Sequence, residues 1–267
     1  MPVAVVRAAV AEAVAVGDVP RRHIPRRTVE LEARRRHRVH VSRCWLVLGL
    51  ALSSGFAMAD DAATVELPKV VLVGDSIRLS YAECVLNQLD GEAVVVSPRA
   101  NGGDSSNVLK HLDTWVIDER PSVVHFNCGI HDIKRFKATG KFQVSPDEYE
   151  ANLRNIVQRI RQRTDALVVF ATTTPILDDR SAAARRDRDY ELLNASVNRY
   201  NAIAKRLMGE LDVPVNDLNS LLSDPSPPLK TGALIGTDGV HLTPAAAELL
   251  GAAVAACVRE HSAPAND

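Results

Sequence analysis

The chain has few cysteines, and their number and spacing argue against a disulfide framework or a metal site. Of the four, Cys44 lies in a segment that we expect to be removed, which leaves Cys84, Cys128 and Cys257. An odd number permits at most one internal disulfide, so the chain is not a small domain held together by disulfides. The spacing of these thiols matches no metal site, and we expect neither a metal nor a cofactor.

The sequence also lacks an excess of basic residues beyond its first 43 positions. The whole chain has a formal net charge of −1, and the part from Asp60 onward is near −7. An acidic domain without a basic stripe is poorly suited to binding nucleic acid, so we expect no such partner. Residues 60–267 are enough for a single domain with a sizeable core, and they contain no internal repeat.

No apolar run is long enough for stable insertion into a membrane. The longest, Trp45–Leu52, follows an arginine-rich stretch and is followed by Ala57-Met58-Ala59. This order predicts a signal peptide over residues 41–59, cleaved before Asp60, and hence a secreted or periplasmic protein. A retained anchor or a buried helix is the alternative.

Residues 1–40 contain nine arginines against four acidic residues and show no apolar periodicity. Signal peptides rarely have so long a basic extension, and we expect these residues not to be part of the mature protein. Translation from Val39 or Val41 at a non-standard start codon would explain them. A basic arm that binds an anionic partner is the alternative.

Apolar segments rich in valine alternate with longer helical patterns, which predicts an α/β fold around a parallel sheet. We expect a flavodoxin-like three-layer α/β/α domain with five strands in the order 2-1-3-4-5. The expected strands are 69–74, 92–97, 122–128, 166–172 and 213–216. The expected helices are 77–90, 105–119, 146–163, 187–210 and 244–260, with loops at 173–186 and 222–237.

Chemically active side chains follow several of these strands. Ser76 comes just after the first strand, His131 and Asp132 after the third, and Gly103 after the second. Ligands of such sheets bind at the carboxyl ends of the strands, where the strand order reverses. The loop with Asp238, which precedes the last helix, can reach the same edge.

Two motifs supply the parts of a serine hydrolase. Gly74-Asp75-Ser76 ends the first strand in a serine, and Asp238-Gly239-Val240-His241 places an aspartate three residues before a histidine. A serine hydroxyl needs a base to take its proton, and a carboxylate fixes the tautomer of that base. The alternatives are a serine that caps a helix, and a turn aspartate beside a surface histidine.

Four blocks in residues 67–260 resemble the SGNH/GDSL hydrolase family of esterases, lipases and carbohydrate deacetylases. They are Gly74-Asp75-Ser76-Ile77, Gly103-Asp104-Ser105-Ser106, Cys128-Gly129-Ile130-His131-Asp132 and Asp238-Gly239-Val240-His241. The resemblance implies Ser76 as nucleophile, His241 as general base and Asp238 as its partner. It also implies that the backbone N–H of Gly103 donates to the oxyanion.

The third block departs from the family, which usually has an asparagine where this chain has His131. A neutral histidine can donate one N–H to the oxyanion, so we assign His131 to the oxyanion hole with the backbone of Ser76 and Gly103. Asn127 is the second candidate, although on a strand it would need a bulge to face the site. A further alternative is that His131 binds substrate.

Other residues near these motifs allow further interpretations. Cys128 permits a cysteine nucleophile, which would require an electropositive, exposed setting. Arg78 is expected to be a solvated charge, with attraction of an anionic substrate as the alternative. The run from Arg185 to Asp189 is expected to be an exposed helix start with local ion pairs.

The sequence thus predicts a secreted serine esterase that removes short acyl groups, such as acetyl, from a carbohydrate or a small molecule. It would act through an acyl-enzyme on Ser76. The alternatives are a non-catalytic carbohydrate-binding protein of the same fold and an acyltransferase. Other substrate-binding residues and the oligomeric state cannot be assigned from the sequence.

Overall fold

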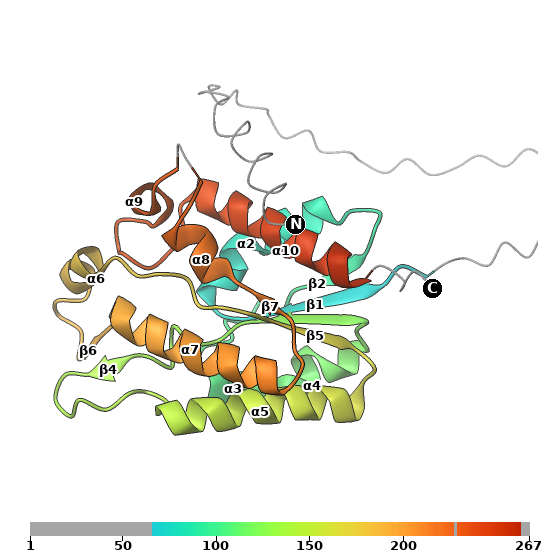
Figure 1. The fold of residues 1–267 in the computed structure, drawn as a ribbon, viewed down its shortest axis with the longest axis horizontal. Helices are drawn as coiled ribbons and strands as arrows, with labels where there is room; N and C mark the ends of the chain where they lie inside the picture. Colours follow the sequence, from blue (N-terminus) through green and yellow to red (C-terminus); the bar gives the residue numbers. More distant parts are fainter. Residues whose placement is uncertain (1–65, 227–228, 263–267) are drawn as a thin grey trace, which may run out of the picture. The chain divides into compact units, whose positions relative to one another are not determined.

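A computed structural model describes residues 66–226 and 229–262, and the predicted basic extension and signal peptide lie outside them (Figure 1). A parallel sheet runs through the described part in the order β2-β1-β3-β5-β7. Its strands are β1 (Lys69–Val73), β2 (Val94–Val96), β3 (Val123–Phe126), β5 (Leu167–Ala171) and β7 (Val215–Asn216). Counted along this sheet, the order is the predicted 2-1-3-4-5, which is confirmed.

Helices cover both faces of the sheet, which confirms the three-layer fold (Figure 1). Alternate residues of β1 point to opposite faces: Val71 and Val73 belong to one apolar cluster, Val70 and Leu72 to the other. The first cluster includes α3 (Ser105–Lys110), α4 (Leu112–Trp115), η1 (Ile117–Glu119), α5 (Pro146–Arg163) and α7 (Asn194–Glu210). The second includes α2 (Ser76–Gln88), α8 (Leu218–Ser223), α9 (Thr231–Leu234) and α10 (Pro244–Ser262).

Helix boundaries agree with the sequence where a capping signal is present. The predicted helix 146–163 matches α5, whose capping box pairs Ser145 with Glu148. The predicted helix 105–119 is wrong, because the chain bends at His111 and Val116 and forms three short helices instead. The predicted loop 222–237 contains the last residues of α8 and the short helix α9.

The segment between β5 and α7 also differs from the prediction. The expected loop 173–186 contains a short helix, α6 (Asp178–Ala184). The expected helix 187–210 begins only at Asn194, because β6 (Tyr190–Glu191) pairs with β4 (Arg135–Phe136) in a small antiparallel sheet. Neither two-residue strand has a sequence pattern that could predict it.

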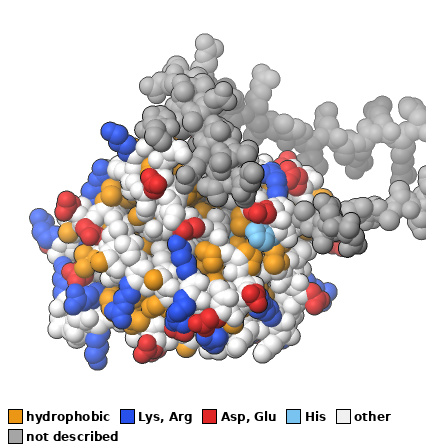
Figure 2. Space-filling view, in the orientation of Figure 1, with side chains coloured by type: hydrophobic (Ala, Val, Ile, Leu, Met, Phe, Trp, Pro, Cys, Tyr) orange, Lys and Arg blue, Asp and Glu red, His pale blue; other side chains and the backbone are white. Residues whose placement is uncertain are grey.

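The visible surface is mixed in character. In the orientation of Figure 1, basic and acidic side chains are interspersed, with hydrophobic side chains scattered among them (Figure 2). Across residues 66–226 and 229–262, no helix combines the length and the apolar character that a membrane span requires.

The first and last helices of the described chain lie against each other. A Cβ atom added to Gly251 of α10 would collide with Cβ of Cys84 of α2. Glycine at this position therefore allows the two helices to approach closely. This packing sets how the start of α2 lies relative to the start of α10.

Two carboxylic acids are buried at the carboxyl edge of the sheet. Asp75 and Asp132 are both inaccessible to solvent, and each has one carboxylate oxygen without a hydrogen-bond partner among the described residues. Burial raises the pKa of Asp132 to about 7, although the hydroxyl and N–H groups of Ser105 oppose the change. Burial likewise raises the pKa of Asp75 to about 6, although the hydrogen bond from the N–H of Ile77 acts to lower it. The fold holds both acids in an environment that favours the neutral form.

Replacement of Gly251 by alanine tests the helix contact. We expect Gly251→Ala to lower the free energy of unfolding by about 1–3 kcal/mol, because the added methyl group overpacks the interface with α2. Gly209 of α7 is the matched control, since a Cβ there would meet no atom within 4 Å. Gly209→Ala should raise stability by up to about 1 kcal/mol through helix propensity. Denaturant unfolding of both variants measures the difference, and equal effects would contradict the close approach.

Asp132→Asn tests the buried acid. In the unfolded chain Asp132 ionises near the ordinary aspartate pKa of 3.8, whereas in the folded chain its pKa is about 7. The folded state therefore binds more protons between these values, and stability falls as the pH rises through them. From pH 5 to pH 8 the wild type should lose roughly 2–3 kcal/mol more than Asp132→Asn, which stays neutral. Parallel stability profiles for the two proteins, measured by urea unfolding, would contradict this assignment.

Candidate active site

Ser76 is the first residue of α2 and follows the last residue of β1, Val73, after two intervening residues. The helix cap is Asp75, whose Oδ1 accepts the N–H of Ile77 at 2.9 Å. The interpretation of Ser76 as a capping serine is therefore wrong. Its Oγ instead lies 3.0 Å from Nε2 of His241, a residue 165 positions further along the chain.

The loop before α10 holds an aspartate and a histidine in one hydrogen-bonded unit, here called the Asp238 loop (residues 236–243). Oδ1 of Asp238 accepts the backbone N–H groups of Val240 and His241, at 3.1 and 2.9 Å. Oδ2 lies 2.5 Å from Nδ1 of His241. The structure thus joins Ser76, His241 and Asp238 (the triad) in a continuous chain of hydrogen bonds.

These contacts fix the ionisation of Asp238 and the tautomer of His241. Burial alone would raise the pKa of Asp238, but the backbone and side-chain N–H groups of His241 and the N–H of Val240 lower it to about 2. An ionised carboxylate only accepts hydrogen bonds, so Nδ1 of His241 carries a proton. In the neutral ring Nε2 is then a base that faces the Ser76 hydroxyl.

A second loop, the Gly103 loop (residues 97–103), packs against the Ser76 turn. The N–H of Gly102 donates to the carbonyl of Gly74 at 2.9 Å. Arg78 donates to the same carbonyl and also to Ser97 Oγ, Pro98 O and Ala100 O, at 2.7–2.9 Å. Arg78 is only 1% exposed, so the expectation of a solvated charge is wrong. Its guanidinium joins the Gly103 loop to the nucleophile turn.

Gly103 has a backbone φ of +65°, a conformation that glycine adopts without strain. Its N–H, implied by the resemblance as an oxyanion donor, bonds to Oδ1 of Asn101 at 2.9 Å. In the present structure the side chain of Asn101 thus accepts the hydrogen bond from the N–H of Gly103. Donation to a substrate oxygen would require Asn101 to share the N–H or to turn away.

The side chain of His131 is partly buried. Burial lowers the pKa of His131 to about 4, and the charges of Lys134 and His241 act in the same direction, whereas Asp104 opposes them. The ring is therefore neutral near pH 7, with one N–H donor. Among the described residues it has no hydrogen-bond partner, so this donor is available to a ligand.

Asn127 lies deeper than His131. It is 3% exposed, and its backbone N–H continues the pairing of β3 with β1 by donating to Val73 O at 2.9 Å. Its side chain fills the space beside Gly74, where an added Cβ would collide with Oδ1 of Asn127. This placement makes Asn127 a support beneath the nucleophile turn.

Arg185 contacts the triad, which sequence reasoning missed. The expectation of an exposed helix start is wrong for this residue, because its side chain is only 12% exposed and lies 3.4 Å from Oδ2 of Asp238. The neighbouring Arg186 is exposed as expected and pairs with Asp187. Alternating charges in the sequence do not distinguish these two arginines.

Other reactive groups near the site are not arranged for catalysis. Burial raises the pKa of Cys128 well above its ordinary value, so this thiol stays protonated. Within residues 66–226 and 229–262, no group of three or more His, Cys, Asp or Glu residues could hold a metal ion.

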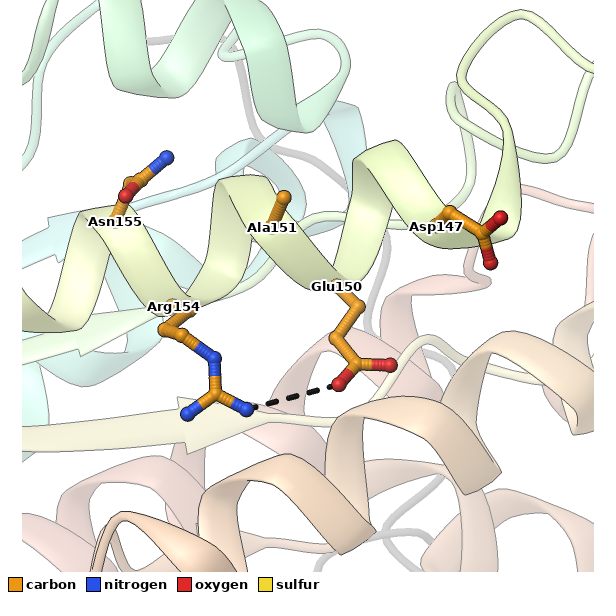
Figure 3. Close-up of a pocket in the computed structure, with 5 residues that line it drawn as sticks. All are labelled: Asp147, Glu150, Ala151, Arg154 and Asn155. Carbon is orange, nitrogen blue, oxygen red and sulfur yellow. Dashed lines mark ion pairs between the residues drawn. The ribbon is translucent and has the colours of Figure 1, made fainter.

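A hollow of about 320 Å³ lies along the outer side of α5, lined by Asp147, Glu150, Ala151, Arg154 and Asn155 (Figure 3). Glu150 and Arg154 form an ion pair of 3.6 Å within it. Arg154 also pairs with Glu210 of α7 at 3.0 Å. None of the lining side chains bonds to the triad, and the ion pairs explain the hollow as a polar surface between two helices.

Solved structures share this fold. A lipase/acylhydrolase from Enterococcus faecalis is 19% identical, with a TM-score of 0.60 over 75% of this chain and 100% of that chain. An acetylxylan esterase from Geobacillus stearothermophilus is 20% identical, with a TM-score of 0.57 over 74% of this chain and 96% of that one. The acetyl xylan esterase AlAXEase is 18% identical, with a TM-score of 0.56 over 71% and 99% of the two chains.

No curated protein sequence matches the chain. The sequence profile of the GDSL-like lipase/acylhydrolase family matches residues 73–249, which include Ser76, Gly103, His131, Asp238 and His241. This match confirms the predicted resemblance and the prediction of a serine hydrolase that acts on ester bonds. The chain belongs to the GDSL-like lipase/acylhydrolase family.

Proposed function

We propose that this esterase removes short acyl groups, such as acetyl, from a carbohydrate or a small molecule through an acyl-enzyme on Ser76. The proposal rests on one observation above all, the hydrogen-bonded chain from Ser76 Oγ through His241 to Asp238. A serine at this place is otherwise a poor nucleophile, and this chain of contacts activates it.

In the first half-reaction Oγ of Ser76 attacks the ester carbonyl carbon while Nε2 of His241 takes the hydroxyl proton. The carboxylate of Asp238 stabilises the resulting imidazolium. The tetrahedral intermediate collapses when the bond to the alkoxy oxygen breaks, and His241 gives its proton to the leaving alcohol. The acyl group is then bound to Ser76.

The second half-reaction uses the same groups with water. His241 takes a proton from a water molecule, whose oxygen attacks the acyl carbon. The new tetrahedral intermediate releases the carboxylic acid, and the proton returns to Ser76 Oγ. The side chain of His241 is 54% exposed, so water reaches the base directly.

We assign the oxyanion hole to the N–H groups of Ser76 and Gly103 and to the ring of His131. The start of α2 points backbone N–H groups and the positive end of its dipole toward the site of Ser76. His131 is neutral near pH 7 because its pKa is about 4, and it supplies one N–H. Asn101, bonded to Gly103 in the present structure, would yield this N–H to the substrate.

The structural neighbours support the substrate class. The Geobacillus enzyme is described as an acetylxylan esterase, and AlAXEase as an acetyl xylan esterase. Two further structures of the Geobacillus esterase are of catalytic mutants, one of an aspartate and one of a histidine three positions later. Asp238 and His241 have the same spacing. The predicted signal peptide over residues 41–59 supports a substrate outside the cytoplasm.

Ser76→Ala tests the nucleophile. We expect hydrolysis of p-nitrophenyl acetate by residues 60–267 to fall by about 10³-fold or more, because no other group can form the acyl-enzyme. Absorbance of released p-nitrophenol measures the rate, and circular dichroism checks the fold. Full activity in the variant would reject Ser76, and a well-folded wild type without activity would favour the binding-protein alternative.

His131→Ala and Asn127→Ala together test the oxyanion hole. Loss of one oxyanion donor costs roughly 10²–10³-fold in kcat, and we expect this loss for His131→Ala. Asn127→Ala should lower the melting temperature and change kcat far less. Small and equal losses of kcat in the two variants would contradict the assignment of His131 to the oxyanion hole.

Product analysis separates hydrolysis from acyl transfer. With p-nitrophenyl acetate and a competing sugar alcohol, we expect acetate as the main product by chromatography, because the exposed His241 is open to water. Predominance of the acetylated sugar at low alcohol concentration would identify an acyltransferase instead.

A further inference from the structure

The short helix α6 and the residues at its ends form a support for the Asp238 loop. The N–H of Leu177 donates to Gly239 O at 2.9 Å. Nη1 of Arg180 donates to Ile235 O at 2.7 Å and to Gly232 O at 3.0 Å. The loop and the residues just before it are thus tied to α6 by backbone and side-chain donors.

Gly239 shows how closely the two segments meet. Its φ is +74°, and a Cβ built on it would lie 2.5 Å from Leu177 O and collide with the backbone N of Ser181. Only glycine fits here without displacing α6. The position of the Asp238 loop is therefore set by α6.

Arg185, the residue directly after α6, extends this support to the triad itself. Nη1 donates to the backbone carbonyl of Asp238 at 2.8 Å, and Nη2 lies 3.4 Å from its Oδ2. The same Oδ2 accepts Nδ1–H of His241. One planar guanidinium therefore contacts both the main chain and the carboxylate of Asp238.

We propose that Arg185 is a positioning residue, which holds the Asp238 carboxylate so that Oδ2 stays directed at Nδ1 of His241. This inference rests on the proposed function of the triad. Two donors in a rigid fork restrict the side-chain rotation of Asp238 more than the backbone bonds to Oδ1 do alone.

Kinetics of three variants test the proposal. Arg185→Gln should lower kcat roughly 10–100-fold at unchanged KM, because a misdirected carboxylate affects the reaction step and not substrate binding. Arg185→Lys should recover only part of kcat, since an ammonium keeps the charge but not the fork. Arg186→Gln, a change of the same charge at a side chain that is 82% exposed, is the matched control and should match the wild type.

Proton NMR of the wild type and Arg185→Gln supplies a readout that does not depend on turnover. The downfield Nδ1 proton of His241, assigned by its loss in Asp238→Ala, should exchange faster with water in Arg185→Gln. An unchanged resonance with wild-type kcat would overturn the proposal. The proposal would also be overturned if kcat of Arg185→Gln fell together with its melting temperature and Arg185→Lys recovered none of the lost kcat.

These experiments separate this inference from the proposed function. If Ser76→Ala stays active, the proposed function fails, and the NMR signal still reports whether Arg185 orders the Asp238–His241 bond. If Ser76→Ala is inactive while Arg185→Gln matches the wild type in rate and spectrum, only the role of Arg185 is rejected.

Discussion

The packing of α2 against α10 is the contact on which the site depends. Ser76 begins α2 and His241 lies three residues before α10, so the two side chains meet only if both helices start at the same place. Gly251 and Cys84, each about two turns into its helix, touch where the helices run side by side. Two segments from opposite ends of the described chain thereby form one reactive centre.

The elements that depend on local sequence could be predicted. Valine-rich segments indicate strands and a capping box indicates a helix start, which is why the sequence predicts the strands of the sheet and α5. Two of the segments for which the prediction is wrong, α6 and the β4–β6 pair, are short and contact residues distant in the sequence. Periodicity cannot detect a helix of two turns whose role is to contact another loop.

In the candidate site, too, some residues could be predicted from local sequence and others could not. Ser76, Asp238 and His241 lie in short motifs whose residue types imply their chemistry, and the structure brings them together. Arg78 and Arg185 do not stand out in the sequence, because a buried arginine and a solvated one look alike there. Their roles follow from the carbonyl and carboxylate oxygens around them, which tertiary structure alone supplies.

The orientation of His241 affects how the enzyme treats the alcohol half of its substrates. Its side chain is 54% exposed, and under the proposed function it is this ring that protonates the departing oxygen. If the proposed function holds, the alcohol is released at a ring in contact with solvent, so water can replace it at this base without any opening of the protein.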